Sequence, residues 1–193
     1  MSGVSLAMEA IDAANSDDPS LWNGEPLALA QGRLAHDWVV SLDPGASDAV
    51  RLAARAHHLR RWVIPRLSYP DGRAGYLRWR RDQKARHAVE LRKILEQTEV
   101  DPAIVDRSAA IVAKIGLGTD AEVQVFEDAV CLTFVQTQLG STAERLDAER
   151  MVIVVAKTLA KMSDDARAAA LTIELDERGA ALVARALELH DGG

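Results

Sequence analysis

Hydrophobic positions recur every three to four residues along almost the whole chain, which is the spacing of amphipathic α-helices. Short turns rich in Pro, Gly, Asn and Asp interrupt this pattern and divide it into eight or nine predicted helices. Their approximate ranges are 4–14, 26–42, 47–62, 74–96, 102–115, 120–139, 143–162, 164–172 and 176–190. No strand-like alternation competes with the helical spacing, so the sequence predicts an all-α fold.

The domain organisation follows from length and composition. The 193 residues are 48% hydrophobic, which is enough to bury a core without disulfides or a structural metal. With no linker and no repeat, we expect a single domain over residues 1–193, with a core at about 4–162 and the C-terminal helices (164–190) packed on it. Cys131 lies inside an apolar run, which predicts a buried, reduced thiol. Neither a signal-like segment nor a membrane-length apolar stretch is visible, so we expect a cytoplasmic protein without a membrane partner.

One segment breaks the helical pattern. Val63–Gly75 contains two prolines and two glycines and is predicted to be an irregular connection that carries Arg66. Loops of this length inside compact domains are often functional.

The distribution of charge singles out the same region. The net charge is −6, yet residues 51–93 hold 13 of the 23 Lys and Arg and only three acids. This asymmetry favours an anionic partner at one face of the protein. The alternative is that the arginines form ion pairs with acids on neighbouring helices.

Three histidines lie in this basic region. His57 and His58 are adjacent near the end of the third predicted helix, about 100° apart around its axis, so one can bind a ligand while the other supports it. His87 follows Arg80 at helical spacing and stands where the polar part of its helix meets the apolar part, with Lys84 on the same side. The alternatives are two partly exposed histidines on a basic helix, and a boundary histidine satisfied by its neighbours.

Asp128 is the most informative carboxylate. Its helix is apolar almost all round, so the side chain should be buried, and a buried carboxylate needs a metal, an arginine or several hydrogen-bond donors. Glu127 is a possible second acceptor. A buried Asp–Arg pair without a catalytic role is the alternative. Lys114 is predicted in the last turn of its helix, where a cation suits the helix dipole.

The central residues resemble an uncharacterised family, domain of unknown function 4202. The resemblance rests on Arg33, Ala-His-His-Leu-Arg-Arg-Trp (56–62), Ile-Pro-Arg (64–66), Tyr-Pro (69–70), Gly-Tyr-Leu-Arg-Trp-Arg (75–80), His87 and Phe-Glu-Asp-Ala-Val-Cys-Leu (126–132). It covers nearly the whole chain and implies no established activity.

A more distant similarity is to the HD superfamily of helical, metal-dependent phosphohydrolases. The segment with His57-His58 resembles the helix that carries the family's His-Asp doublet, His87 its later histidine, and Glu127-Asp128 its terminal aspartate region. His58 replaces the aspartate of the doublet, and Arg33 or His36 stands at the position of the first ligand. The resemblance implies an HD-like helical core and a divalent metal ion.

Together, the residues and the resemblance define a candidate site. If the protein is an enzyme, we expect metal-assisted hydrolysis of a phosphorylated small molecule or nucleotide. The expected metal ligands are His57, His58, His87 and Asp128, and the expected catalytic residues are His58, His87 and Glu127. The expected substrate-binding residues are Arg60, Arg61, Arg66, Tyr76, Arg80, Lys84 and Lys114.

Two alternatives stay open. One is a non-enzymatic module that recognises an anionic metabolite or RNA through an arginine-rich pocket, and the acidic remainder and 4% aromatic content favour the metabolite. The other makes the arginines a subunit interface in a homo-oligomer.

Overall fold

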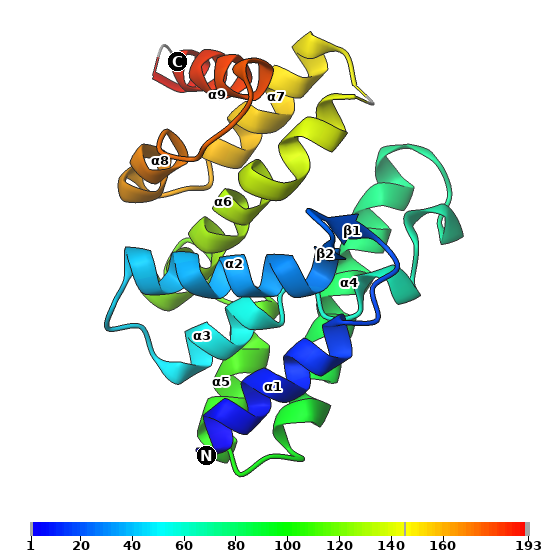
Figure 1. Ribbon diagram of the computed structural model, residues 1–193, viewed down its shortest axis with the longest axis vertical. Helices are drawn as coiled ribbons and strands as arrows, with labels where there is room; N and C mark the ends of the chain where they lie inside the picture. Colours follow the sequence, from blue (N-terminus) through cyan, green and yellow to red (C-terminus); the bar gives the residue numbers. More distant parts are fainter. Residues whose placement is uncertain (1, 145, 192–193) are drawn as a thin grey trace. The chain divides into compact units, whose positions relative to one another are not determined.

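The structure, a computed structural model, describes residues 2–144 and 146–191. It divides into two compact units, residues 1–126 and 127–193 (Figure 1). Helix α6 (Ala121–Ala143) runs through the division. The other helices are α1 (Gly3–Asn15), α2 (Leu27–Leu42), α3 (Asp48–Arg55), α4 (Gly72–Leu95), α5 (Pro102–Val112), α7 (Ala148–Leu159), α8 (Asp164–Ala170) and α9 (Glu177–Asp191).

The predicted helical character is confirmed, since the chain is mostly α-helix with boundaries near the predicted ones. Helix caps follow the sequence: Ser47 Oγ accepts from Val50 N, and Ser163 Oγ accepts from Ala166 N. Cys131 is buried, as predicted. The expectation of a single domain stays a prediction.

The all-α prediction needs one correction. β1 (Leu21–Trp22) pairs antiparallel with β2 (Glu25–Pro26) in a minimal hairpin. Asn23 and Gly24 between them both have positive φ, the conformation that an Asn-Gly hairpin turn requires. Two-residue strands are too short to produce an alternating pattern, so the Asn-Gly pair was the only local signal of the hairpin.

The third predicted helix, 47–62, is also corrected. α3 ends at Arg55, and residues 56–60 form turns that lead into two short 3-10 helices, η1 (Arg61–Val63) and η2 (Arg66–Ser68). Arg60 has a left-handed conformation (φ 48°), and its N–H donates to the side-chain oxygen of buried Asn15 on α1 (3.0 Å). A contact 45 residues away along the chain therefore holds the turn at Arg60.

The next helix boundaries shift for local reasons. Lys114 lies beyond the end of α5, with positive φ and its N–H bonded to the Ile111 carbonyl (2.8 Å), so it is part of the C-terminal turn and not of the helix. α6 extends to Ala143, and α7 begins only at Ala148, after the cap Asp147.

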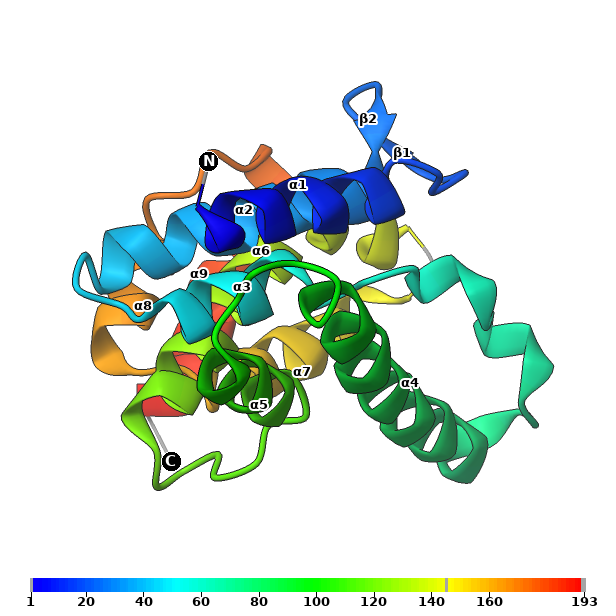
Figure 2. The same cartoon turned by 90° about the horizontal axis from the view of Figure 1, so that it is seen from below.

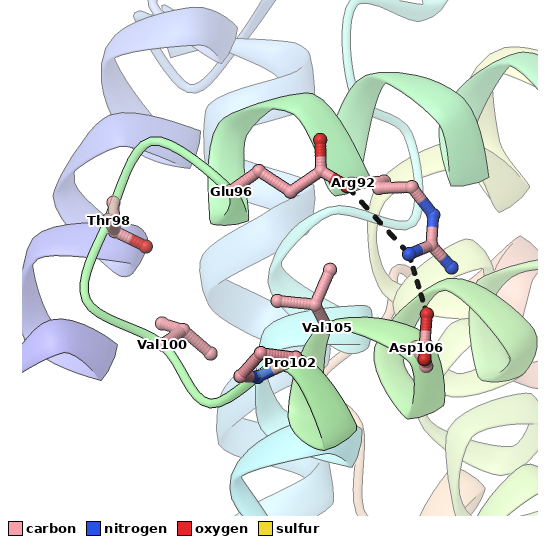
Figure 3. Close-up of a pocket in the computed structure, with 7 residues that line it drawn as sticks. All are labelled: Arg92, Glu96, Thr98, Val100, Pro102, Val105 and Asp106. Atoms are coloured by element: carbon pink, nitrogen blue, oxygen red, sulfur yellow. Dashed lines mark hydrogen bonds and ion pairs between the residues drawn. The ribbon is translucent and has the colours of Figure 1, made fainter.

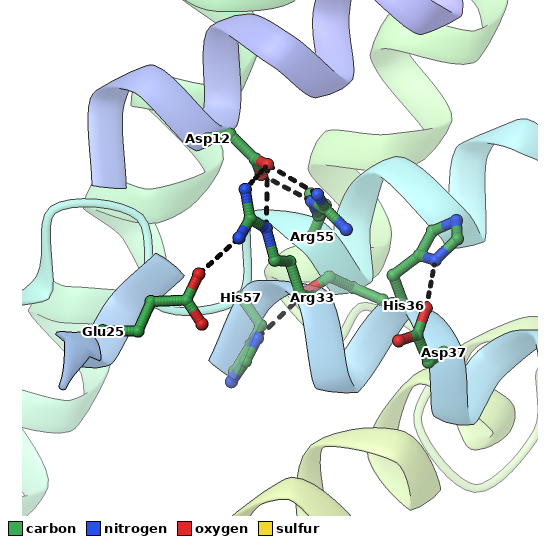
Figure 4. A network of polar contacts seen from close by, with 8 residues as sticks. Asp12, Glu25, Arg33, His36, Asp37, Arg55 and His57 are labelled. Atoms are coloured by element: carbon green, nitrogen blue, oxygen red, sulfur yellow. Dashed lines mark hydrogen bonds and ion pairs between the residues drawn. The ribbon is translucent and has the colours of Figure 1, made fainter. Parts of the chain in front are cut away.

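In the first unit, α3 packs against α1, α2 and α5, and α4 packs against α1 and α5. Gly32 on α2 permits the close approach of α3, because a Cβ there would lie 2.4 Å from the Arg55 carbonyl oxygen. Figure 4 shows Arg33 and Arg55 converging on Asp12, at 3.1 Å and 2.6 Å. These ion pairs join α1, α2 and α3.

The connection between α3 and α4 projects outward and then leads back to the first turn of α4 (Figure 2). Gly75 makes the return possible, since a Cβ at this position would lie 1.8 Å from the Pro70 carbonyl oxygen. The Arg66 guanidinium donates to the carbonyls of Tyr69 and Pro70, both at 2.9 Å. The predicted irregular segment, Val63–Gly75, is thus a loop only as far as Asp71, since Gly72–Gly75 already belong to α4; within the loop, Arg66 satisfies the carbonyls of Tyr69 and Pro70.

In the second unit, α7 packs against α9, and α8 is capped at its N-terminus by Ser163. Met151, Val155 and Leu159 are fully buried and lie on one face of α7. No helix of the part of the chain that the structure describes has the length and apolarity to cross a membrane.

Candidate anion-binding site

The first unit brings the three predicted histidines together. His57 and His58 lie in the turn after α3, and their rings stack with centroids 4.1 Å apart. His87, from α4, has its ring centroid 6.3 Å from that of His58. We call these three residues the histidine cluster. Because the chain has left the helix at this point, both adjacent imidazoles share one environment, which two neighbours on a helix would not.

Hydrogen bonds determine which nitrogen of each imidazole ring carries the proton. His57 Nδ1 donates to the Ala54 carbonyl (2.9 Å), and His58 Nδ1 donates to the Gln31 side-chain oxygen (2.6 Å). His87 hydrogen-bonds to the backbone of His57. In a neutral imidazole with a proton on Nδ1, the Nε2 atom has a free lone pair. The Nε2 atoms of His57 and His87 are buried and bond to none of the residues that the structure describes.

The cluster is neutral at physiological pH. Burial lowers the pKa of His57 from 6.5 to about 4, and the positive charges of Arg61 and Lys114 act in the same direction. Burial likewise holds the pKa values of His58 and His87 well below 6.5, and the charge of Arg61 contributes to both. A neutral cluster among cations is available for hydrogen bonding and does not repel its neighbours.

Two residues that position the site were not anticipated from the sequence. Gln31 is 2% exposed and orients His58, and Asn15 is 1% exposed and holds the turn at Arg60. Both are polar residues on otherwise buried helix faces, which is the signal that could have identified them. The sequence does not say which partner each side chain serves.

Most arginines of the basic region are accounted for by partners within the fold. Arg66 and Arg86 donate to backbone carbonyls. Four others form ion pairs: Arg55 with Asp12 (2.6 Å), Arg60 with Glu90 (3.4 Å), Arg81 with Asp82 (3.0 Å) and Arg92 with Asp106 (2.6 Å). Arg55 and Arg92 therefore pair with acids on neighbouring helices, whereas Arg81 pairs with the next residue of its own helix and Arg60 joins the turn to α4.

Arg61 and Arg80 differ from the rest. Both are half-buried, and neither side chain forms an ion pair or hydrogen bond with any residue in the described ranges. The Arg61 guanidinium lies over the Trp79 ring, 4.4 Å from its centre. Burial, together with the charges of Arg80 and Arg86, lowers the pKa of Arg61 to about 10, whereas Tyr76 acts to raise this pKa. Arg73 and Arg78 also form no close ion pair there, but they are exposed to solvent, and the charge of Arg78 acts on Asp82.

The backbone that carries Arg61 is clamped by α4. The Gln83 side-chain amide donates to the carbonyls of Arg61 (2.8 Å) and Ile64 (2.9 Å). Trp79 Nε1 donates to the Ile64 carbonyl as well (2.9 Å). The position of Arg61 is therefore set by two buried side chains on the same face of α4.

The remaining predicted ligand-binding residues lie close to these elements. Tyr76 is one turn before Arg80 on α4, and the Arg80 guanidinium is 5.8 Å from its ring centre. Lys114 is half-buried, with its Nζ 5.8 Å from the Phe126 ring. Lys84 is half-buried and engaged in contacts.

Glu127 and Asp128 belong to the second unit and are 2% exposed, which confirms the predicted burial of Asp128. The Asp128 carboxylate accepts from Ser163 N (3.0 Å) and Ser163 Oγ (2.6 Å). Glu127 lies 3.9 Å from Lys161 Nζ and accepts from Cys131 Sγ (4.0 Å). Ser163, at the start of α8, thus supplies two of the hydrogen-bond donors that the buried Asp128 carboxylate needs.

Two observations concern whether these side chains could bind a metal ion. The free Nε2 lone pairs of His57 and His87 have the chemistry of metal ligands, with the opposite ring nitrogen held by a hydrogen bond. Within residues 2–144 and 146–191, however, no three His, Cys, Asp or Glu side chains form a group that could hold a metal ion.

Two surface pockets lie elsewhere. One, of about 200 Å³, is formed by α4, α5 and the turn between them, and Arg92 crosses it to reach Glu96 and Asp106 (Figure 3). The other, of about 90 Å³, lies near Leu139 and Arg178 in the second unit. None of the predicted site residues lines either pocket.

Fold and site together define a class of protein: it is mostly helical and has a neutral histidine cluster beside half-buried arginines. The chain belongs to the family described as domain of unknown function DUF4202, whose match covers residues 5–183. This confirms the family resemblance seen in the sequence. No curated protein and no solved structure matches the chain.

Proposed function

We propose that this protein binds the phosphate or carboxylate group of a small anionic molecule at Arg61 and Arg80. The observation that carries the proposal is that both guanidinium groups are half-buried and form no ion pair within the described residues, whereas four nearby arginines do. Desolvating a cation without an acceptor costs free energy, and an anionic ligand would recover it through charge-assisted hydrogen bonds.

The surroundings support this proposal. The histidine cluster is neutral and adds no competing anion, while the charge of Lys114 acts on His57 and His58. Two positive-φ residues, Arg60 and Lys114, lie in the turns next to the cluster, and backbone strain of this kind concentrates at functional sites.

Isothermal titration with inorganic phosphate tests the proposal. Arg61→Gln and Arg80→Gln should each lower the affinity about tenfold or more, because each removes a hydrogen-bonding cation. Arg92→Gln is the matched control, since it removes a charge from α4 that Asp106 already neutralises. Equal effects of all three substitutions would mean that net charge and not a defined site controls binding.

A second candidate is a metal-dependent, HD-like phosphohydrolase with an HD-like helical core. It is supported by the free Nε2 lone pairs of His57 and His87 and by the order of the histidines and of Glu127-Asp128 in the chain. A divalent ion, when bound, would supply an activated water for attack on a phosphate ester. In this reading the histidines are ligands, and His58 and His87 are the catalytic candidates of the first unit.

Elemental analysis of untagged protein decides between the two candidates. The hydrolase requires a divalent metal near 1:1 that His57→Ala or His87→Ala removes, together with metal-dependent release of phosphate from a phosphomonoester. If the protein binds phosphate through Arg61 but takes up no metal, the binding function stands and the hydrolase is rejected.

A further inference from the structure

An aromatic ring stands exposed beside the two unpaired arginines. The Tyr76 side chain projects from α4 and remains 43% exposed, although its ring lies 6.1 Å from that of Trp79. Trp79 itself is 9% exposed, and its indole N–H is used by the Ile64 carbonyl. Trp79 is therefore a wall of the site, whereas Tyr76 has ring surface available to a ligand.

The spacing of these groups is informative. Tyr76 and Arg80 are four residues apart on α4 and so lie on the same face, one helical turn of about 5.4 Å apart. Arg61 interacts electrostatically with both residues, and its guanidinium lies over the ring of Trp79. Two cations that lack acidic partners and one exposed aromatic ring thus form a single patch.

We propose that the ligand is a nucleotide, whose phosphate binds Arg61 and Arg80 and whose base stacks on Tyr76. This inference rests on the phosphate binding proposed above and names the class of ligand. A nucleoside monophosphate carries its base one ribose away from its phosphate, which suits a ring and a guanidinium one helical turn apart. A sugar phosphate or inorganic phosphate would satisfy the arginines but leave the ring uncovered.

Titration of the full chain with three ligands tests the proposal: inorganic phosphate, ribose 5-phosphate and adenosine 5′-monophosphate. Stacking of one base should make the nucleotide bind about tenfold more tightly than ribose 5-phosphate. Tyr76→Phe should preserve this ratio, because it keeps the ring. Tyr76→Ala should reduce the ratio to about one, while inorganic phosphate still binds.

Leu77→Ala is the matched control. Leu77 is the next residue of α4 and is 51% exposed, so its truncation removes apolar surface from the same turn without touching the patch. The ratio should not change. Because inorganic phosphate has no base to stack, its retained binding also shows that Tyr76→Ala is folded.

The outcomes separate the two proposals. A ratio near one in the unmodified protein, or a ratio that survives Tyr76→Ala, would overturn base stacking and leave the Arg61-dependent binding of phosphate in place. If none of the three ligands binds, both proposals fail.

Discussion

At the scale of single residues, the histidine cluster is held in a deprotonated form by its surroundings. The charge of Arg61 acts on all three rings and that of Lys114 on His57 and His58, so each proton taken up would add a charge near existing cations. A histidine whose pKa is lower in the folded than in the unfolded chain makes folding dependent on pH. The cluster therefore couples the protonation of this region to the stability of the first unit.

The pH dependence of stability can be predicted from His57. Between pH 6.5 and about 4, the unfolded chain binds a proton at His57 that the folded chain does not, so stability falls as pH falls through this window. We expect a loss of about 2 kcal/mol from His57 alone between pH 7 and pH 5, with His58 and His87 adding in the same direction. Urea unfolding at the two pH values measures this loss.

Substitution identifies the source of that loss. His57→Asn keeps a donor near the Ala54 carbonyl but does not titrate, so the difference between pH 7 and pH 5 should shrink by about 2 kcal/mol. His36→Gln removes an imidazole from α2 and leaves the cluster intact, which makes it the control. An unchanged difference in His57→Asn would contradict the lowered pKa.

At the scale of elements, α4 organises the site. One of its faces carries Trp79, Gln83 and His87, all buried, and these side chains hold the turn and loop that follow α3. The opposite side of its first turns exposes arginines to solvent. The helix thus fixes the backbone of Arg61 by hydrogen bonds while it supplies Tyr76 and Arg80 itself.

Gln83→Ala tests this arrangement. The substitution deprives the carbonyls of Arg61 and Ile64 of a buried donor and should destabilise the protein by about 1–3 kcal/mol. It should also weaken phosphate binding, because Arg61 loses its support. Gln97→Ala, at an exposed site just after α4, should change stability by less than about 0.5 kcal/mol. Equal stabilities of the two variants in urea unfolding would refute the clamp.

At the scale of the whole molecule, the net charge of −6 sets the kind of anion that can bind. Residues 51–93 alone carry a net charge of +10, from 13 Lys and Arg and three acids, but ion pairs and carbonyl groups occupy many of their arginines. A polymer with many phosphates needs many free cations and is repelled by the acidic remainder. A small ligand with one phosphate needs only the two arginines of the site.

Salt dependence distinguishes a nucleotide from RNA. A single-stranded RNA oligonucleotide should bind no more tightly than adenosine 5′-monophosphate. Its affinity should fall with a logarithmic slope no steeper than about −1.4, the value for two neutralised phosphates on a single strand. Fluorescence anisotropy of a labelled oligonucleotide between 50 and 200 mM salt, concentrations at which such slopes are resolved, measures the slope. A clearly steeper slope with tight binding would favour the RNA alternative.

Much of the fold was predictable because helices are specified locally. The spacing of apolar residues and caps such as Ser47 and Ser163 placed most helix boundaries within a few residues. The candidate site was predictable in part: the basic region, the three histidines and the burial of Asp128 all followed from the sequence. The roles of Gln31 and Asn15 were not, because each depends on a partner distant in sequence.

The sequence by itself determined the helical architecture, the family and the concentration of cations, since these depend on residue type and short-range spacing. Only the tertiary structure decided where α3 ends and which arginines have partners. Asn15 holds the left-handed turn at Arg60, Glu90 neutralises Arg60, and Arg61 is left beside Trp79 without an acid among the described residues. The physical reason is that ion pairs and buried hydrogen bonds act between groups that only folding brings within a few ångströms.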